Sequence, residues 1–185
     1  MLKKIPVILL LMLPSRGEAQ FDTAFVRKSI RECADSLVSG FKERNWDRFT
    51  RYSYPPLVAS MGGKEGFTRF IKETMAAVPD SAWKQYEPGD ILQVLRTGSD
   101  LQAVIELHTT LQWESMRIIT TTYLVGESWS GGRFWTFFDS RGSRESALQI
   151  KPDLAGDLVI PEKKEKMEPV QPTAGNGSAP AATNQ

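Results

Sequence analysis

The segment LQAVIELHTTLQW, residues 101–113, decides the fold class, because one parity of its positions is almost entirely apolar. Successive side chains of a β-strand point to opposite faces of a sheet, so such a pattern predicts a long strand with one buried face. The apolar parity consists of Leu101, Ala103, Ile105, Leu107, Thr109, Leu111 and Trp113.

Three further strands are predicted around this one. Residues 91–96 precede it across the turn sequence TGSD, and residues 116–125 follow it with the Ile, Thr, Tyr and Val content that strands favour. Residues 134–139 form the fourth, after the turn sequence SGG. Because all the connections are short, the strands are predicted to pair antiparallel, in a sheet of four or more strands.

Three helices are predicted before the sheet. In residues 22–44, apolar side chains recur at helical spacing, although Gly40 weakens the prediction for the last turn. A short helix follows Asn45 over residues 46–52, and a third spans residues 64–78. Cys33 falls in the apolar stripe of the first helix, which favours a buried structural residue over a nucleophile or an intermolecular bridge. The chain is therefore assigned to the α+β class.

The segment from Asn45 to Ile71, NWDRFTRYSYPPLVASMGGKEGFTRFI, resembles the nuclear transport factor 2-like superfamily. A short helix, a PPLV segment and a Gly-Gly turn lead there into an aromatic-rich helix. The resemblance covers roughly residues 22–140. It implies a cone-shaped fold with a strongly curved sheet around the long first helix, a site inside the cone, and frequent dimerisation through the sheet. It does not choose among isomerases, dehydratases, ligand binders and adaptors.

The two ends of the chain are predicted to lie outside the folded domain. Residues 1–19 have the form of a signal peptide, with Lys3 and Lys4 before a short apolar run and small residues up to Ala19. We therefore expect export, to a periplasm or the medium, with no membrane anchor after cleavage. Residues 20–160 form the single domain, with a terminal arm over residues 150–160. Residues 161–185 are predicted to be a disordered tail.

Charge and composition exclude several classes of function. The chain has 23 Lys and Arg against 22 Asp and Glu, so it lacks the basic excess of a nucleic-acid binder. It has one His and one Cys, so we expect no zinc site of the His and Cys type and no internal disulfide. No cofactor is expected. His108 falls on the polar parity of its strand, where a solvated or cross-strand hydrogen-bonded role is predicted.

A candidate ligand site follows from the predicted hairpin at Glu114-Ser115, which pairs Trp113 with Met116. Thr109, Thr120 and Thr122 then join Trp113 on one apolar face, as hydrogen-bond anchors for a small apolar ligand or as parts of a filled core. The catalytic alternative is weak: Asp139 or Asp47 would serve as general base, with Tyr52 or Tyr54 as donor.

The third predicted strand is apolar on both faces, since Ile119, Tyr123 and Val125 lie opposite Ile118 and Leu124. A solvated antiparallel sheet should expose polar side chains on one face, so something is expected to cover this one. A second subunit in a homodimer or the arm Leu154–Ile160 would serve. The leading function is a non-enzymatic exported domain that binds a small apolar ligand or a protein partner. The alternatives are a small isomerase or dehydratase and a structural or adaptor dimer.

Overall fold

The computed structural model describes residues 23–113 and 115–170. The predicted signal peptide, its cleavage site and most of the predicted tail lie outside these residues. The described elements are α1 (Thr23–Lys42), α2 (Trp46–Tyr52), α3 (Pro55–Ser60), α4 (Gly63–Ala76), the 3₁₀ turn η1 (Asp80–Ala82), β1 (Trp83–Thr97), β2 (Asp100–Trp113), β3 (Met116–Ser128), β4 (Thr136–Asp139), α5 (Arg144–Ile150) and β5 (Lys164–Pro169).

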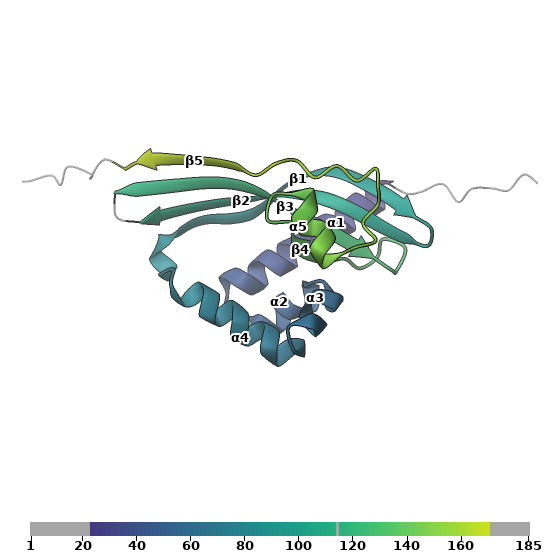
Figure 1. Ribbon diagram of the computed structural model, residues 1–185, viewed down its shortest axis with the longest axis horizontal. Helices are drawn as coiled ribbons and strands as arrows, with labels where there is room; N and C mark the ends of the chain where they lie inside the picture. Colours follow the sequence, from purple (N-terminus) through teal and green to yellow (C-terminus); the bar gives the residue numbers. More distant parts are fainter. Residues whose placement is uncertain (1–22, 114, 171–185) are drawn as a thin grey trace, which may run out of the picture.

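The described strands form one five-stranded antiparallel sheet, with the helices α1 to α4 gathered on one side of it (Figure 1). The order is β1-β2-β3-β4, and β5 also pairs with β3. The strands β4 and β5 share one edge of β3, because β4 lies opposite Leu124–Glu127 and β5 lies opposite Met116–Thr121. Trp113 lies opposite Met116, as the hairpin prediction required.

The α+β class is confirmed, but several details of the prediction are wrong. The sheet is not strongly curled. Among the described residues, four helices rather than three precede the strands, because the PPLV segment itself forms α3, and α5 comes after β4, so the helices are not all N-terminal. Strand β1 begins at Trp83, before Ile91, and it is irregular between Pro88 and Ile91, where the sequence pattern is interrupted.

Residues 164–169 were expected to belong to the disordered tail, yet they form strand β5. Their side chains are almost all exposed, so this strand leaves no hydrophobic pattern in the sequence. What holds it is the pairing of its backbone with β3, continued by a hydrogen bond from the Val170 N–H to the carbonyl of Ser115 at 2.6 Å.

The core on the helix side of the sheet, here called the inner face, is the one that the sequence predicts. Helix α1 buries its apolar stripe against alternate residues of β2 and against Leu124 of β3. The members of the stripe are Val26, Ile30, Cys33, Ala34, Leu37, Val38 and Phe41, each at most 7% exposed.

The opposite face of β3 is covered by the terminal arm. Leu154 and Leu158 pack with Tyr123, Val125 and Phe138, together with residues of α5. The arm therefore provides a cover from within the chain, and the homodimer through the sheet stays a prediction. Among the described residues, no helix combines the length and the apolar character needed to span a membrane.

Candidate functional site

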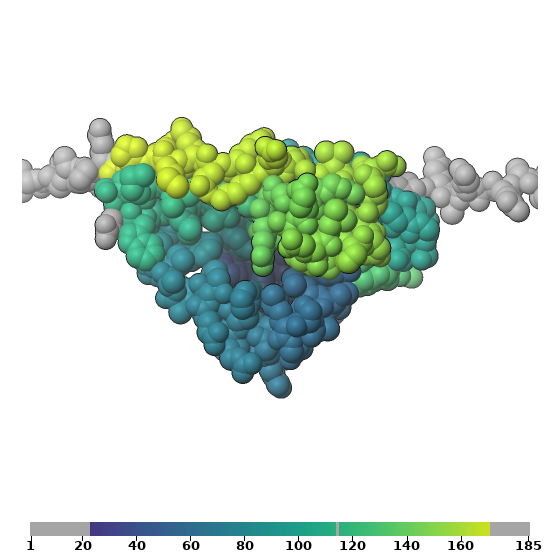
Figure 2. Space-filling view, viewed as in Figure 1, coloured from purple at the N-terminus to yellow at the C-terminus, as the bar shows by residue number. Residues whose placement is uncertain are grey.

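A cavity of about 180 Å³ lies on the inner face, between the sheet and the helices α1 to α4. Figure 2 shows the surface hollowed between the sheet and helix α4. Most of the lining is apolar. The lining residues are Leu37, Phe49, Ser53, Leu57, Met61, Phe67, Phe70, Ile71, Tyr86, Leu124, Phe137, Phe138, Asp139, Arg141 and Ile150.

Local sequence explains how the helices form the wall of this cavity. Gly62 and Gly63 both have positive φ, at 86° and 73°, which turns the chain sharply between α3 and α4. Helix α4 then presents Phe67, Phe70 and Ile71 on one face, at the spacing of an amphipathic helix. Phe67 is 3% exposed and stacks on Phe49 of α2, with ring centroids 5.9 Å apart.

Of the described residues that line the cavity, Asp139 alone carries a carboxyl group, at the end of β4. Its Oδ1 accepts the backbone N–H of Arg141 at 2.7 Å, and its Oδ2 accepts the Thr122 hydroxyl at 3.2 Å. The residue is exposed at the end of β4, yet the surrounding protein partly desolvates its carboxyl and raises the pKa above the usual range, against the lowering effect of these hydrogen bonds. Each carboxyl oxygen still has a free acceptor position for a ligand.

Tyr86 is the other polar aromatic group of the site, and the sequence reasoning missed it. Burial raises the pKa of its phenol, and the charge of Asp139 raises it further, so the hydroxyl stays protonated as a donor. The residue lies on β1 opposite Thr109, before the irregularity at Pro88. That proline and Gly89 end the predicted strand pattern, so no periodicity pointed to Tyr86.

The predicted ligand anchors lie on the inner face, but none of the four lines the cavity, and only Thr122 contacts a lining residue. Thr122 hydrogen-bonds Asp139 at the cavity edge. Thr109 and Thr120 lie opposite each other farther along β2 and β3, outside the lining. Trp113 is 49% exposed at the hairpin end of the sheet and does not line the cavity either.

Of the weak catalytic candidates, the structure places only Asp139 in the cavity. Asp47 is exposed, and its Oδ1 pairs with Lys64 Nζ at 2.9 Å. Tyr54 is buried on the other side of the sheet, with its ring 5.2 Å from that of Phe138. The Tyr52 ring packs against that of Phe134, with the ring centroids 5.3 Å apart, and Tyr52 does not line the cavity.

The structural roles predicted for His108 and Cys33 are confirmed. His108 lies on the sheet face opposite the inner face, here called the outer face, with Nδ1 3.2 Å from the Thr121 hydroxyl across the strand pair and Nε2 3.3 Å from Glu106 Oε2. Cys33 is buried in the inner core, and burial raises the pKa of its thiol. No group of three or more potential metal ligands occurs among residues 23–113 and 115–170.

Comparison of the chain with protein-family models, with curated proteins and with solved structures finds no match in any of the three.

Proposed function

We propose that this protein binds a small, largely apolar molecule in the inner cavity and holds a hydrogen-bond donor of that molecule on Asp139. The observation that carries the proposal is an apolar cavity with a single carboxyl group in its lining. Ligand sites commonly combine apolar walls with a few placed polar groups. The proposed ligand is thus a small apolar molecule, as the sequence predicts, but its polar contacts are Asp139 and Tyr86 in place of Thr109, Thr120 and Trp113.

The cavity volume limits the ligand. About 180 Å³ is close to the ~150 Å³ of an engineered cavity that takes up benzene. We therefore expect a molecule of one or two fused rings, or a larger one that extends through the opening. The element order of helices followed by an antiparallel sheet also supports membership of the nuclear transport factor 2-like superfamily, which remains a proposal, as does export.

The experiment is a calorimetric titration with indole and with indene, which share a shape but differ in the N–H donor. We expect indole to bind about tenfold more tightly, the worth of one hydrogen bond to a charged group. Asp139→Asn should remove most of this preference while indene binding stays unchanged. Equal binding of the two compounds to the unmodified protein would refute the role of Asp139.

A blocking variant locates the ligand. Ile71→Trp places a large ring at the cavity wall, and Lys72→Trp is the matched control because Lys72 is exposed on the same helix and does not line the cavity. Indole binding should be lost in the first variant and kept in the second. Native mass spectrometry of protein purified from its own host then identifies the natural ligand as a mass adduct.

A second candidate function is proton abstraction from a carbon acid by Asp139. The supporting observation is the carboxyl pKa raised by desolvation, next to a phenol that stays protonated and so serves as a donor to a developing oxyanion. Deuterium exchange at the α carbon of cyclohexanone in D₂O tests it by NMR. Exchange above the buffer rate that disappears in Asp139→Asn supports the enzyme; exchange at the buffer rate leaves binding alone.

A further inference from the structure

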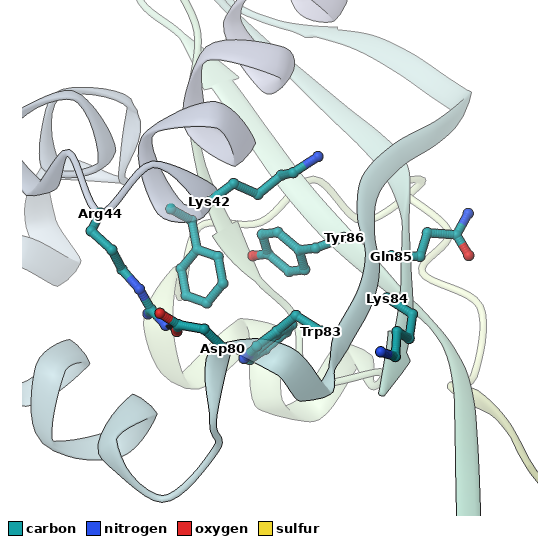
Figure 3. Close-up of a pocket in the computed structure, with 8 residues that line it drawn as sticks. Lys42, Arg44, Asp80, Trp83, Lys84, Gln85 and Tyr86 are labelled. Atoms are coloured by element: carbon teal, nitrogen blue, oxygen red, sulfur yellow. Dashed lines mark hydrogen bonds and ion pairs between the residues drawn. The ribbon is translucent and has the colours of Figure 1, made fainter. Parts of the chain in front are cut away.

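A second recess, separate from the inner cavity, opens between the last turn of α1 and the start of β1 (Figure 3). Its volume is about 240 Å³. Three aromatic rings form one side of it. The ring centroid of Phe41 lies 4.5 Å from that of Tyr86 and 5.1 Å from that of Trp83, and the centroids of Trp83 and Tyr86 are 5.6 Å apart. The Tyr86 ring also lines the inner cavity, so it is a wall common to both sites.

The charged side chains of the recess are predominantly basic. Lys42, Arg44 and Lys84 line it, and among the described residues Asp80 is the only acidic lining residue, so the local charge is +2. This exceeds the +1 of the whole chain. Figure 3 shows Lys42 and Lys84 on opposite sides of Tyr86.

Arg44 already has an acidic partner, whereas the two lysines have none among the described residues. The Arg44 guanidinium pairs with Asp80 and lies 5.7 Å from the centroids of both Phe41 and Trp46. Within the part of the chain that the structure describes, neither Lys42 nor Lys84 forms an ion pair. Two unpaired ammonium groups beside one recess attract an anion into it.

Trp83 adds a buried, unsatisfied polar group to the wall of this recess. Its indole Nε1 is buried and has no hydrogen-bond partner among the described residues. A buried donor without an acceptor costs about 1–3 kcal/mol, so native proteins nearly always satisfy such groups. Because this N–H is buried in the wall of the recess, its resonance reports on a ligand that occupies the recess.

We propose that this recess binds a small aromatic carboxylate. The rings of Phe41, Trp83 and Tyr86 provide the surface for the ligand ring, and the ammonium groups of Lys42 and Lys84, on the two sides of Tyr86, attract its carboxylate as point charges. The volume, larger than that of a benzene-sized cavity, accommodates one ring with its carboxylate.

The probes are benzoate, its neutral analogue benzamide, and inorganic phosphate, each titrated into the full chain at low salt. The readout is the indole N–H resonance of Trp83, identified as the one lost in Trp83→Phe. We expect benzoate to shift this resonance and to bind about tenfold more tightly than benzamide, because a charge-assisted contact is lost. Equal binding of benzoate and benzamide, or of benzoate and phosphate, would overturn the proposal.

Variants separate the recess from general charge and from the inner cavity. Lys84→Gln and Lys42→Gln should each weaken benzoate binding about fivefold. Lys64→Gln is the matched control, because Lys64 lies on α4 outside the recess. An equal loss in the control means non-specific attraction and rejects the site. Loss of benzoate binding in Ile71→Trp would place the ligand in the inner cavity and reject it as well, whereas failure of the indole experiment leaves this test unaffected.

Discussion

The hydroxyl of Thr122 on β3 donates to Oδ2 of Asp139 on β4 at 3.2 Å, at the edge of the inner cavity. The two residues lie on neighbouring strands and on the same face of the sheet, since Leu124, two residues after Thr122, is the register partner of Asp139. This contact fixes the one carboxyl group of the cavity lining against the sheet. Desolvation outweighs the lowering effect of this hydrogen bond on the pKa of Asp139 and couples its protonation to folding.

The first prediction concerns the pH dependence of stability. Desolvation raises the pKa of Asp139 in the folded protein, so the folded state holds this proton more tightly than the unfolded chain does. Its contribution is therefore fully present below the unfolded pKa of about 3.9 and is lost as the pH rises through the folded pKa. Asp139→Asn does not titrate. Relative to the unmodified protein, its free energy of unfolding should rise between about pH 3 and pH 7.

Asp153 supplies a control of opposite sign. Its hydrogen bond from Lys151 Nζ lowers the pKa of its carboxyl, so its contribution is present above the unfolded pKa and is lost as the pH falls through the folded pKa. Asp153→Asn should therefore lose stability at neutral pH and approach the unmodified protein at low pH. Urea unfolding at several pH values measures both variants. The same sign for the two would contradict the assignment of Asp139 as a desolvated carboxyl.

The sequence was informative wherever one face of an element is buried. The stripe of α1 and the alternation of β2 each report a buried face, and the burial of Ile30 and Ile105 follows directly from those patterns. Strand β5 escaped prediction because its side chains are exposed and only backbone pairing holds it. A pattern of apolar residues cannot report pairing of that kind.

The site was predictable in part. The inner face was assigned correctly, and Asp139 was named as a group able to reach it. Tyr86 was missed because Pro88 and Gly89 interrupt β1, so its parity could not be extended backward from Ile91. Tyr54, named as a possible donor, packs on the other side of the sheet, because the segment that carries it gives no period that distinguishes the two faces.

The second prediction concerns a buried ion pair on the outer face. Lys151 is 1% exposed, its Nζ contacts Glu127 Oε1, and Glu127 Oε2 is buried without a partner among the described residues. Burial alone would lower the pKa of Lys151, but its hydrogen bonds to Glu127 and Asp153 raise it, so we treat the lysine as charged. Lys151→Met leaves the carboxylate uncompensated and should cost about 3–5 kcal/mol.

Removing both charges should relieve most of this loss. The double variant Lys151→Met with Glu127→Leu replaces the pair by apolar groups, which is often neutral or stabilising in other proteins. Thermal and urea unfolding of the two single variants and the double variant complete the cycle. A double variant as unstable as Lys151→Met alone would show that the buried pair does more than compensate its own charges.

The third prediction concerns the arm. Leu158 is 1% exposed and packs under the outer face, whereas its neighbour Val159 is 66% exposed. Leu158→Ala should lower the free energy of unfolding by about 2–5 kcal/mol, and Val159→Ala should change it by less than about 0.5 kcal/mol. Similar effects in the two variants would mean that the arm does not cover the sheet in solution, and the homodimer would become the better explanation for its apolar outer face.

The last prediction concerns Gly40, which weakened the sequence prediction of the last turn of α1. In a bare helix, Gly to Ala gains about 1 kcal/mol. Here a Cβ at position 40 would lie 2.6 Å from the backbone N of Phe49 and 3.0 Å from its Cα, so helix α2 would have to move away from α1. We therefore expect Gly40→Ala to lower the free energy of unfolding by about 1–3 kcal/mol, the usual cost of overpacking, despite its better helix propensity.

Asp35→Ala, at an exposed position of the same helix, is the control and should change the free energy of unfolding by less than about 0.5 kcal/mol. Urea unfolding measures both variants, and a Gly40→Ala protein more stable than the unmodified one would show that α2 does not pack against α1 at this distance.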